Sequence, residues 1–168
     1  ISYSIMLIED KAGNKGDVKQ FLSKKLSNVV IDTKKPLIDV TTSLTKSDNN
    51  LGLSANRAMS GDAIALTISS DEPLYNLNIS DVTIDRVNLT NVIKSNNGKV
   101  WTFTGIVNPA NGQMDDYLSY SIASYQDVAG NNGDINLHTN NKLTNVVIDT
   151  KIPIIEEFKI RINDHIIF

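Results

Sequence analysis

Apolar and polar residues alternate in several short segments of this chain. In Ala63–Ser69, the clearest case, Ile64, Leu66 and Ile68 point to one face and the residues between them to the other. This period of two predicts a half-buried β-strand. Strands are also predicted at Ile1–Ile8, Leu26–Ile31, Leu37–Leu44, Val82–Val87, Val92–Lys94, Val100–Val107, Tyr117–Ser124 and Leu143–Ile148.

Turn-forming residues separate these strands. Lys46–Ser60 is polar and is predicted to be a loop, Ser70–Pro73 a turn, and Asn96–Gly98 a hairpin turn. No window has a sustained period of 3.6, so helices are not expected. About seven short strands, with turns every ten to fifteen residues, predict an all-β fold in which two sheets pack as a sandwich. Trp101 is the expected centre of its core.

A long motif occurs twice in the chain. DVAGNNGD at Asp127–Asp134 is followed by LTNVVIDTKIP at Leu143–Pro153, and DKAGNKGD at Asp10–Asp17 is followed by LSNVVIDTKKP at Leu26–Pro36. A shift of about 117 residues aligns the two copies without a gap, and about 21 of the 38 aligned positions are identical. The sequence therefore predicts tandem modules of about 117 residues.

This period divides the chain into three parts. Residues 1–35 are predicted to be the C-terminal strands of a preceding module, residues 36–152 a complete module, and residues 153–168 the first strand or strands of a following one. The third part matches the sequence pattern of the modules less well than the first two parts do. The first residues, ISYSIMLIED, contain neither an initiator Met nor a basic segment, so we expect a piece of a longer protein rather than a signal peptide.

Composition narrows the possible functions. The 168 residues include no cysteine, which excludes disulfides, thiolate metal sites and thiol nucleophiles. The net charge of −3 makes nucleic acid and anionic membranes unfavourable partners. No apolar run is long enough for a membrane span.

Four motifs give the chain a resemblance to a known family. They are GDAIALTISSDEPL at Gly61–Leu74, VWTFT at Val100–Thr104, SYSI with DVAGNNG at Ser119–Gly133, and VVIDTKIP at Val146–Pro153. Together they resemble the bacterial Ig-like repeats of giant surface adhesins. The resemblance implies an Ig-like β-sandwich with Greek-key connections in a tandem array. It also implies an extracellular or cell-surface location, a non-enzymatic stalk role, and neighbouring modules of the same chain as partners.

In such a fold, the loop after the second strand and the loop before the last strand lie at the pole where the linker arrives. Calcium prefers six to eight oxygen ligands, and the resemblance implies calcium at module junctions. The expected ligands at this junction are Asp32, Asp71, Glu72, Asp127 and Asn131. Their equivalents at neighbouring junctions are Asp10, Asn14 and Asp149. The alternative is that these residues only form turns, since Asp and Asn are common turn formers and Asp32 and Asp149 suit Asx turns.

Catalytic signals are weak. The chain has two histidines, His138 and His165, and His138 aligns with Phe21 of the other copy. Asp115 and Asp116 are adjacent on a strand, so they are expected on opposite faces rather than as a catalytic pair. The favoured function is a non-enzymatic stalk module with calcium-stiffened junctions.

Two alternatives remain open. One is a module that binds a glycan or a host protein, which an exposed aromatic row or a concave groove would favour and aromatic residues confined to the core would contradict. The other is the subunit of an extracellular filament, with other copies as partners.

Overall fold

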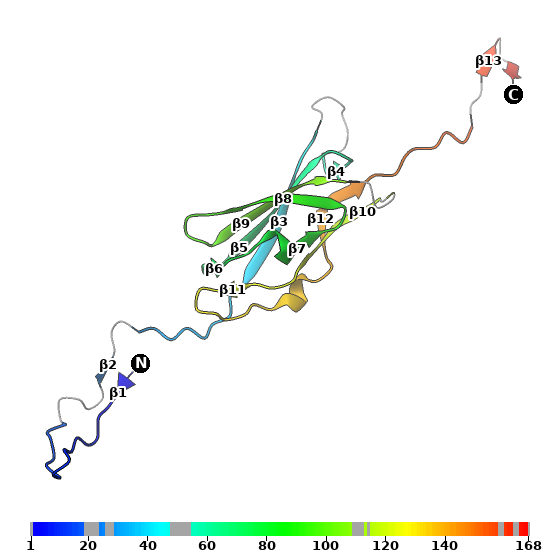
Figure 1. Ribbon diagram of the computed structural model, residues 1–168. Helices are drawn as coiled ribbons and strands as arrows, with labels where there is room; N and C mark the ends of the chain where they lie inside the picture. The colour runs from blue at the N-terminus through cyan, green and yellow to red at the C-terminus, as the bar shows by residue number, and fades with distance from the viewer. Residues whose placement is uncertain are drawn as a thin grey trace. The chain divides into compact units, whose positions relative to one another are not determined.

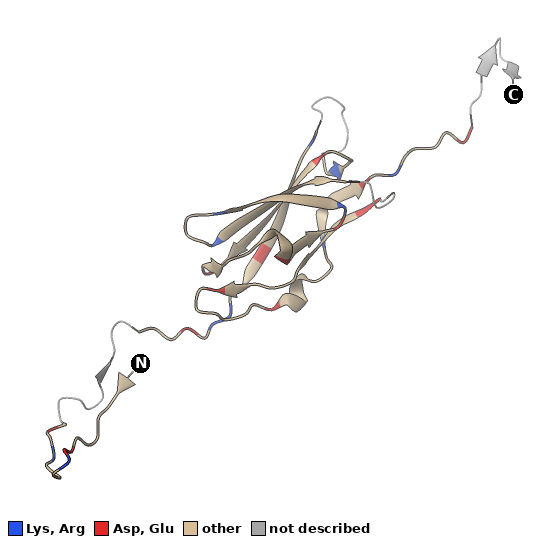
Figure 2. Ribbon diagram, viewed as in Figure 1, with Lys and Arg blue, Asp and Glu red and all other residues tan. Residues whose placement is uncertain are grey.

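The computed structural model describes residues 2–18, 24–25, 29–47, 55–108, 113, 115–157, 160–162 and 165–167. The chain divides into two compact units, residues 1–34 and 35–168 (Figure 1). Most strands belong to the second unit. Among the described residues, charged residues lie mainly in turns and near strand ends (Figure 2).

The first unit contains one short strand pair. Strand β1 (Ser2–Tyr3) pairs antiparallel with β2 (Lys24–Lys25). The strand predicted at Ile1–Ile8 is therefore limited to β1. Of the strand predicted at Leu26–Ile31, residues 26–28 lie outside the described residues, and Val29–Ile31 is not a strand. The described part of this unit supplies no further strand against which these segments can pair, and an unpaired β-segment is not stable by itself.

The second unit begins with an antiparallel sheet in the order β3-β5-β9-β8. Its strands are β3 (Ile38–Thr45), β5 (Ala63–Ser70), β9 (Val100–Val107) and β8 (Val87–Lys94). Burial alternates along β5 and β9, as expected for a sheet with one face in a core.

A second sheet has the order β4-β12-β10-β7. Its strands are β4 (Arg57–Ala58), β12 (Asn141–Asp149), β10 (Asp115–Ile122) and β7 (Val82–Ile84). Strand β4 is parallel to β12, and the other pairs are antiparallel. The chain crosses from one sheet to the other between β5 and β7, between β7 and β8, and between β9 and β10, whereas β8 and β9 pair within one sheet and β10 and β12 within the other. Crossings of this kind give the Greek-key arrangement of an Ig-like sandwich.

Three sequence predictions are corrected here. Val82–Val87 is not one strand, because the chain turns at Asp85–Arg86 and Val87 begins β8 in the other sheet. Arg86 has a φ of 62°, and an arginine gives no sequence signal for this conformation. The short strand predicted at Val92–Lys94 is the end of β8, and the predicted loop Lys46–Ser60 contains β4.

Shorter elements complete the unit. Strand β6 (Leu74–Tyr75) pairs with β11 (Gln126–Asp127), and β13 (Ile160–Ile162) with β14 (His165–Ile167). Two 3₁₀ turns, η2 (Ile79–Asp81) and η4 (Ile135–His138), precede β7 and β12. At one edge, the Asn145 side-chain amide bonds with both the hydroxyl and the carbonyl of Thr42, at 3.0 and 3.1 Å, and so joins β12 to β3.

The core lies between the two sheets. Phe103 is fully buried in β9. Trp101, the expected centre of the core, is buried but 5% exposed, and its indole N–H donates to the Gly98 carbonyl at 3.1 Å. The Lys94 amine lies 4.9 Å from the centre of the Trp101 ring, at the core edge. The facing sheet contributes Leu118, Tyr120, Ile122, Val146 and Ile148.

Candidate functional site

Two turns that are distant in sequence meet at one end of the sandwich. Strand β6 follows the turn at Asp71–Pro73, and its Leu74 is the register partner of Asp127 in β11. This pairing brings a carboxylate oxygen of Glu72 within 4.8 Å of one of Asp127. Of the predicted ligands in the sandwich, Glu72 and Asp127 are therefore the carboxylates that the fold brings together.

The Asp127 carboxylate forms the turn that follows it. One oxygen accepts hydrogen bonds from the backbone N–H groups of Ala129 and Asn131, both at 2.8 Å, and the other accepts from the Asn131 side-chain amide at 2.7 Å. Burial raises the pKa of Asp127, but these bonds outweigh it and hold the pKa below the ordinary value. Gly130, at a φ of 93°, allows the chain to turn.

The first copy of the motif forms the same turn in the first unit. Asp10 accepts from the backbone N–H groups of Ala12 and Asn14, both at 2.9 Å, and from the Asn14 side-chain amide at 2.8 Å. Gly13 has a φ of 88°. The repeated residues thus have a turn-forming role in both copies, and a metal role in addition to it stays a prediction.

The predicted ligand Asp71 joins the start of the module to this end of the sandwich. Its carboxylate accepts from the Leu37 N–H at 2.9 Å, and its own N–H donates to the Leu37 carbonyl at 3.1 Å. Pro36, one residue earlier, is fully buried. Residue 36 is therefore already part of the sandwich.

Asp32 and Asp149 each form an Asx turn, in their respective units. Asp32 accepts from the Lys34 N–H at 3.0 Å, and Asp149 from the Lys151 N–H at 3.2 Å. The other Asp149 oxygen lies 3.0 Å from the guanidinium of Arg57, which also contacts Asp115. This ion-pair cluster lies at the end of β10 where Asp115 begins the strand, whereas Asp127 follows the other end of that strand.

No sequence pattern indicated the role of Arg57, because this residue lies in a segment predicted to be a loop. The adjacent residues Asp115 and Asp116 have different partners, as expected for side chains on opposite faces of a strand. Asp115 contacts Arg57, whereas Asp116 lies 2.6 Å from the amine of Lys142.

Asp62 is a buried carboxylate that the sequence did not single out. It is 1% exposed and accepts from the backbone N–H groups of Ser47 and Met59 at 2.8 and 2.9 Å, and from the Lys46 amine at 3.2 Å. Burial by itself would raise the pKa of Asp62, but the hydrogen bonds from Met59, Ser47 and Lys46 have the larger combined effect and hold this pKa below its ordinary value. Asp62 fixes the loop that leads into β5.

His138 is buried between two tyrosines. Its Nδ1 lies 3.2 Å from the Tyr120 hydroxyl, and its ring meets the Tyr125 ring edge-on, with centroids 6.0 Å apart. The Tyr120 hydroxyl forms hydrogen bonds with the side chains of His138 and Asn141. Burial lowers the pKa of His138 below 6.5, against the weaker opposing effect of Asp134 and Asp39.

The sandwich is expected to lose stability between pH 7.5 and pH 5. A histidine whose pKa is lower in the folded state than in the unfolded chain contributes its full stability above the unfolded value near 6.5. That stability decreases as the pH falls, because the unfolded chain takes up the proton more readily. Chemical unfolding at a series of pH values measures the effect.

His138→Phe is the matched variant, because the aligned residue of the other copy is Phe21. It should flatten the profile in this range. An unchanged profile would assign the pH dependence to other groups.

Comparison with known proteins places the sandwich in a family. The sequence matches the bacterial Ig-like domain over residues 32–146, more than half of the chain. No curated protein and no solved structure matched it. Such domains are typically extracellular or surface modules and are generally non-catalytic binding or structural units. None of the described helices is long and apolar enough to cross a membrane. The chain belongs to the bacterial Ig-like domain family.

Proposed function

We propose that this protein is a structural stalk segment of a long bacterial cell-surface or secreted adhesin or fibre, with no catalytic role. Its function is to provide length and stiffness, and ligand recognition that defines the adhesin lies elsewhere in the full protein. The observation that carries the proposal is the repeated motif, which forms the same Asp-centred turn in both units. A motif that recurs in one chain with the same turn geometry is typical of tandem arrays of modules.

Exposure of apolar residues in the first unit supports the proposed array. Tyr3 is 39% and Ile31 67% exposed, whereas their equivalents Tyr120 and Ile148 are 3% and 0% exposed in the core. On this proposal, the first unit would carry one half of a core, and the facing sheet of the complete preceding module would supply the other half. Residues 1–35 are accordingly proposed to end a preceding module, residues 36–152 to form the complete one, and residues 153–168 to begin the next.

The linker between modules is proposed to be short. Asp149 ends β12, so its equivalent Asp32 would end the last strand of the preceding module. Pro36 is already buried in the next one. Only three residues remain between these positions, and a linker this short restricts bending.

Calcium is proposed to stiffen this junction. Glu72 and Asp127 present two carboxylates within 4.8 Å of each other, and a cation would relieve their repulsion. Hard carboxylate and amide oxygens are the ligands that calcium prefers. Asp32 at the end of the preceding module, Asp71 beside Glu72, and the amide oxygen of Asn131 would complete the set. Binding that fastens the linker to the sandwich would couple neighbouring modules.

Calcium should raise the melting temperature of the sandwich. A ligand at about one hundred times its Kd stabilises the folded state by about 2.7 kcal/mol, which corresponds to a rise of roughly 10 °C for a domain of this size. Scanning calorimetry in calcium and in EDTA measures the rise. Equal melting temperatures in the two conditions would remove calcium from the proposal.

Two variants locate the effect. Asp32→Ala should abolish the calcium response and leave the melting temperature in EDTA unchanged, because Asp32 lies outside the sandwich core. Asp85→Ala, an exposed acid in the Asp85–Arg86 turn, should keep the full response. A response that survives Asp32→Ala would place the cation away from the linker.

The stalk role is tested separately, by small-angle scattering of two consecutive complete modules. A stalk requires an extended particle. Its maximum dimension should have one well-defined value in calcium and a broad distribution of values in EDTA. A compact particle, or modules that reorient freely in calcium, would contradict a stalk even if calcium binds.

A further inference from the structure

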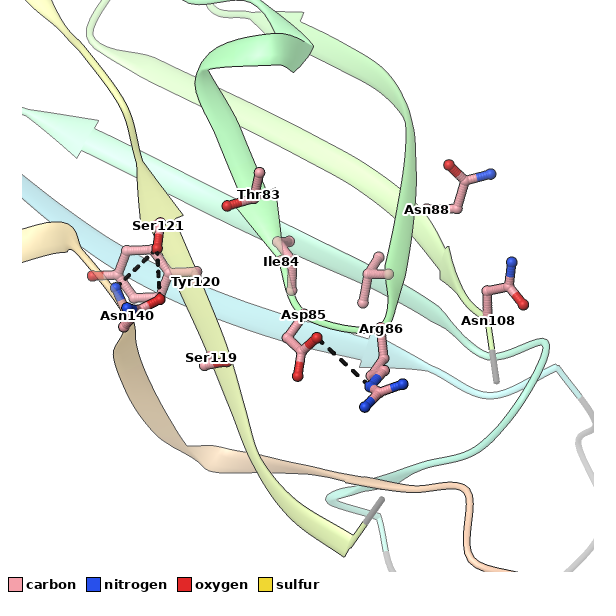
Figure 3. Close-up of a pocket in the computed structure, with 11 residues that line it drawn as sticks. Thr83, Ile84, Asp85, Arg86, Asn88, Asn108, Ser119, Tyr120, Ser121 and Asn140 are labelled. Carbon is pink, nitrogen blue, oxygen red and sulfur yellow. Dashed lines mark hydrogen bonds and ion pairs between the residues drawn. The ribbon is translucent and has the colours of Figure 1, made fainter. Parts of the chain in front are cut away.

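A polar groove lies along the edge of the sandwich where β7 and β8 meet. It has a volume of about 670 Å³, within the range of small-molecule sites in proteins. Figure 3 shows its lining: Thr83 in β7, the turn at Asp85–Arg86, Asn108 after β9, Ser121 in β10, and Asn140 before β12. The stalk function does not use this groove.

The chemistry of the lining selects a class of ligand. Asp85 and Arg86 form an ion pair at 3.6 Å, so the groove has no excess of either charge. This balance is unfavourable for a phosphate or a metal ion. Most other side chains are amides and hydroxyls, which leave little apolar surface for a lipid or an apolar peptide side chain. A side-chain amide holds a donor and an acceptor side by side, and adjacent hydroxyls of a sugar ring require that pairing.

The groove is also fixed in shape. On one side, the Asn140 N–H donates to the Ser121 hydroxyl at 2.9 Å, and that hydroxyl bonds the Asn140 amide oxygen at 3.3 Å. On the other side, the Arg86 carbonyl accepts from the Asn108 N–H at 2.8 Å. A lining that is ordered before binding loses less conformational entropy when a ligand arrives.

Two residues of the lining adopt a strained backbone. Arg86 has a φ of 62° and Asn140 one of 50°, in the left-handed region. Asn tolerates this region, whereas arginine is rare there. Among the described residues, one other non-glycine residue, Asn76 at 44°, has a positive φ. Strain of this kind is concentrated at functional sites.

We infer that this groove is a binding site for a neutral saccharide, recognised through its hydroxyl groups by the amide and hydroxyl side chains and by Arg86. The site would give the module a sugar-binding activity in addition to its structural role. The groove supplies no exposed aromatic platform, because Tyr120 is buried beneath it. Recognition therefore depends on hydrogen bonds, and discrimination between sugar stereoisomers should be strong.

NMR titration of the 168-residue chain tests the inference. The probes are maltotriose, lactose, N,N′-diacetylchitobiose and 3′-sialyllactose, each added to about 10 mM. At least one neutral saccharide should give saturable amide shifts, confined to residues 83–88, 108, 119–121 and 140. No saturable shift with any neutral probe, shifts elsewhere in the sandwich, or binding of sialyllactose alone would overturn the inference.

Substitutions to glycine remove side chains without disturbing the backbone. Arg86→Gly and Asn140→Gly each delete a polar group, and glycine accepts the positive φ. Each should weaken saccharide binding at least tenfold, while the dispersed spectrum shows that the fold is intact. Asn76→Gly is the matched control outside the groove and should bind as the parent chain does. Unchanged affinity in both groove variants would also overturn the inference.

Discussion

Asp62→Ala is expected to lower the free energy of unfolding of the sandwich by about 1–3 kcal/mol, the cost of leaving buried hydrogen-bond donors without their acceptor. The Asp62 carboxylate is 1% exposed, and its partners come from the segments on both sides of the loop before β5. Removing it leaves the amides of Ser47 and Met59 without their acceptor and the Lys46 amine without its counter-charge. Unfolding in guanidinium chloride, followed by tryptophan fluorescence, measures the loss.

Two further variants distinguish a specific role from a general effect of charge. Asp62→Asn should also destabilise, because one of its two accepting oxygens becomes an amide group that faces a donor. Asp85→Ala, which removes an exposed acid, should change the free energy of unfolding by less than about 0.5 kcal/mol. A loss for Asp62→Ala no larger than for Asp85→Ala would mean that the buried Asp62 carboxylate contributes nothing.

Phe103→Ala is expected to cost about 3–5 kcal/mol, the range for deleting a fully buried aromatic side chain. Phe103 is 0% exposed, and its register partners on the two neighbouring strands are Leu66 and Val92. Its ring also faces the second sheet, so the deletion opens a cavity in the middle of the core. The remaining side chains cannot close this cavity without moving both sheets.

Ile106→Ala on the same strand is the matched control. Ile106 is 43% exposed, and its truncation should cost about 1 kcal/mol or less. Unfolding in urea compares the two variants. Similar losses for the two would show that β9 is not organised with one face in the core.

Much of the fold could be predicted from local patterns. The alternation of Ile64, Leu66 and Ile68 predicts both a strand and its buried face, because the period of two is a property of the extended chain. The Gly and Asn residues of the repeated motif predict a turn, because both residue types accept a positive φ. The Asp127 carboxylate accepts its hydrogen bonds from residues within four positions of itself, so its turn is encoded locally.

Turn positions without Gly or Asn could not be found in this way. The chain reverses at Arg86, a residue type that carries no turn signal. The start of β8 therefore depends on the packing of two sheets, which no local pattern reports. Asp62 and Arg57 are similar cases, since each has an ordinary sequence context and acquires its role from partners on other segments.

The candidate sites divide in the same manner. By itself, the sequence determined an all-β chain with tandem repeats and acidic turns, since these depend on side-chain alternation and on residues close together along the chain. Only the tertiary structure decided that Glu72 meets Asp127, through the pairing of β6 with β11, while Asp149 pairs with Arg57. The groove at Arg86 and Asn140 likewise exists only where separate strands meet. Distances between such residues are set by the register and packing of whole sheets, and the energy of that packing is distributed over the entire core.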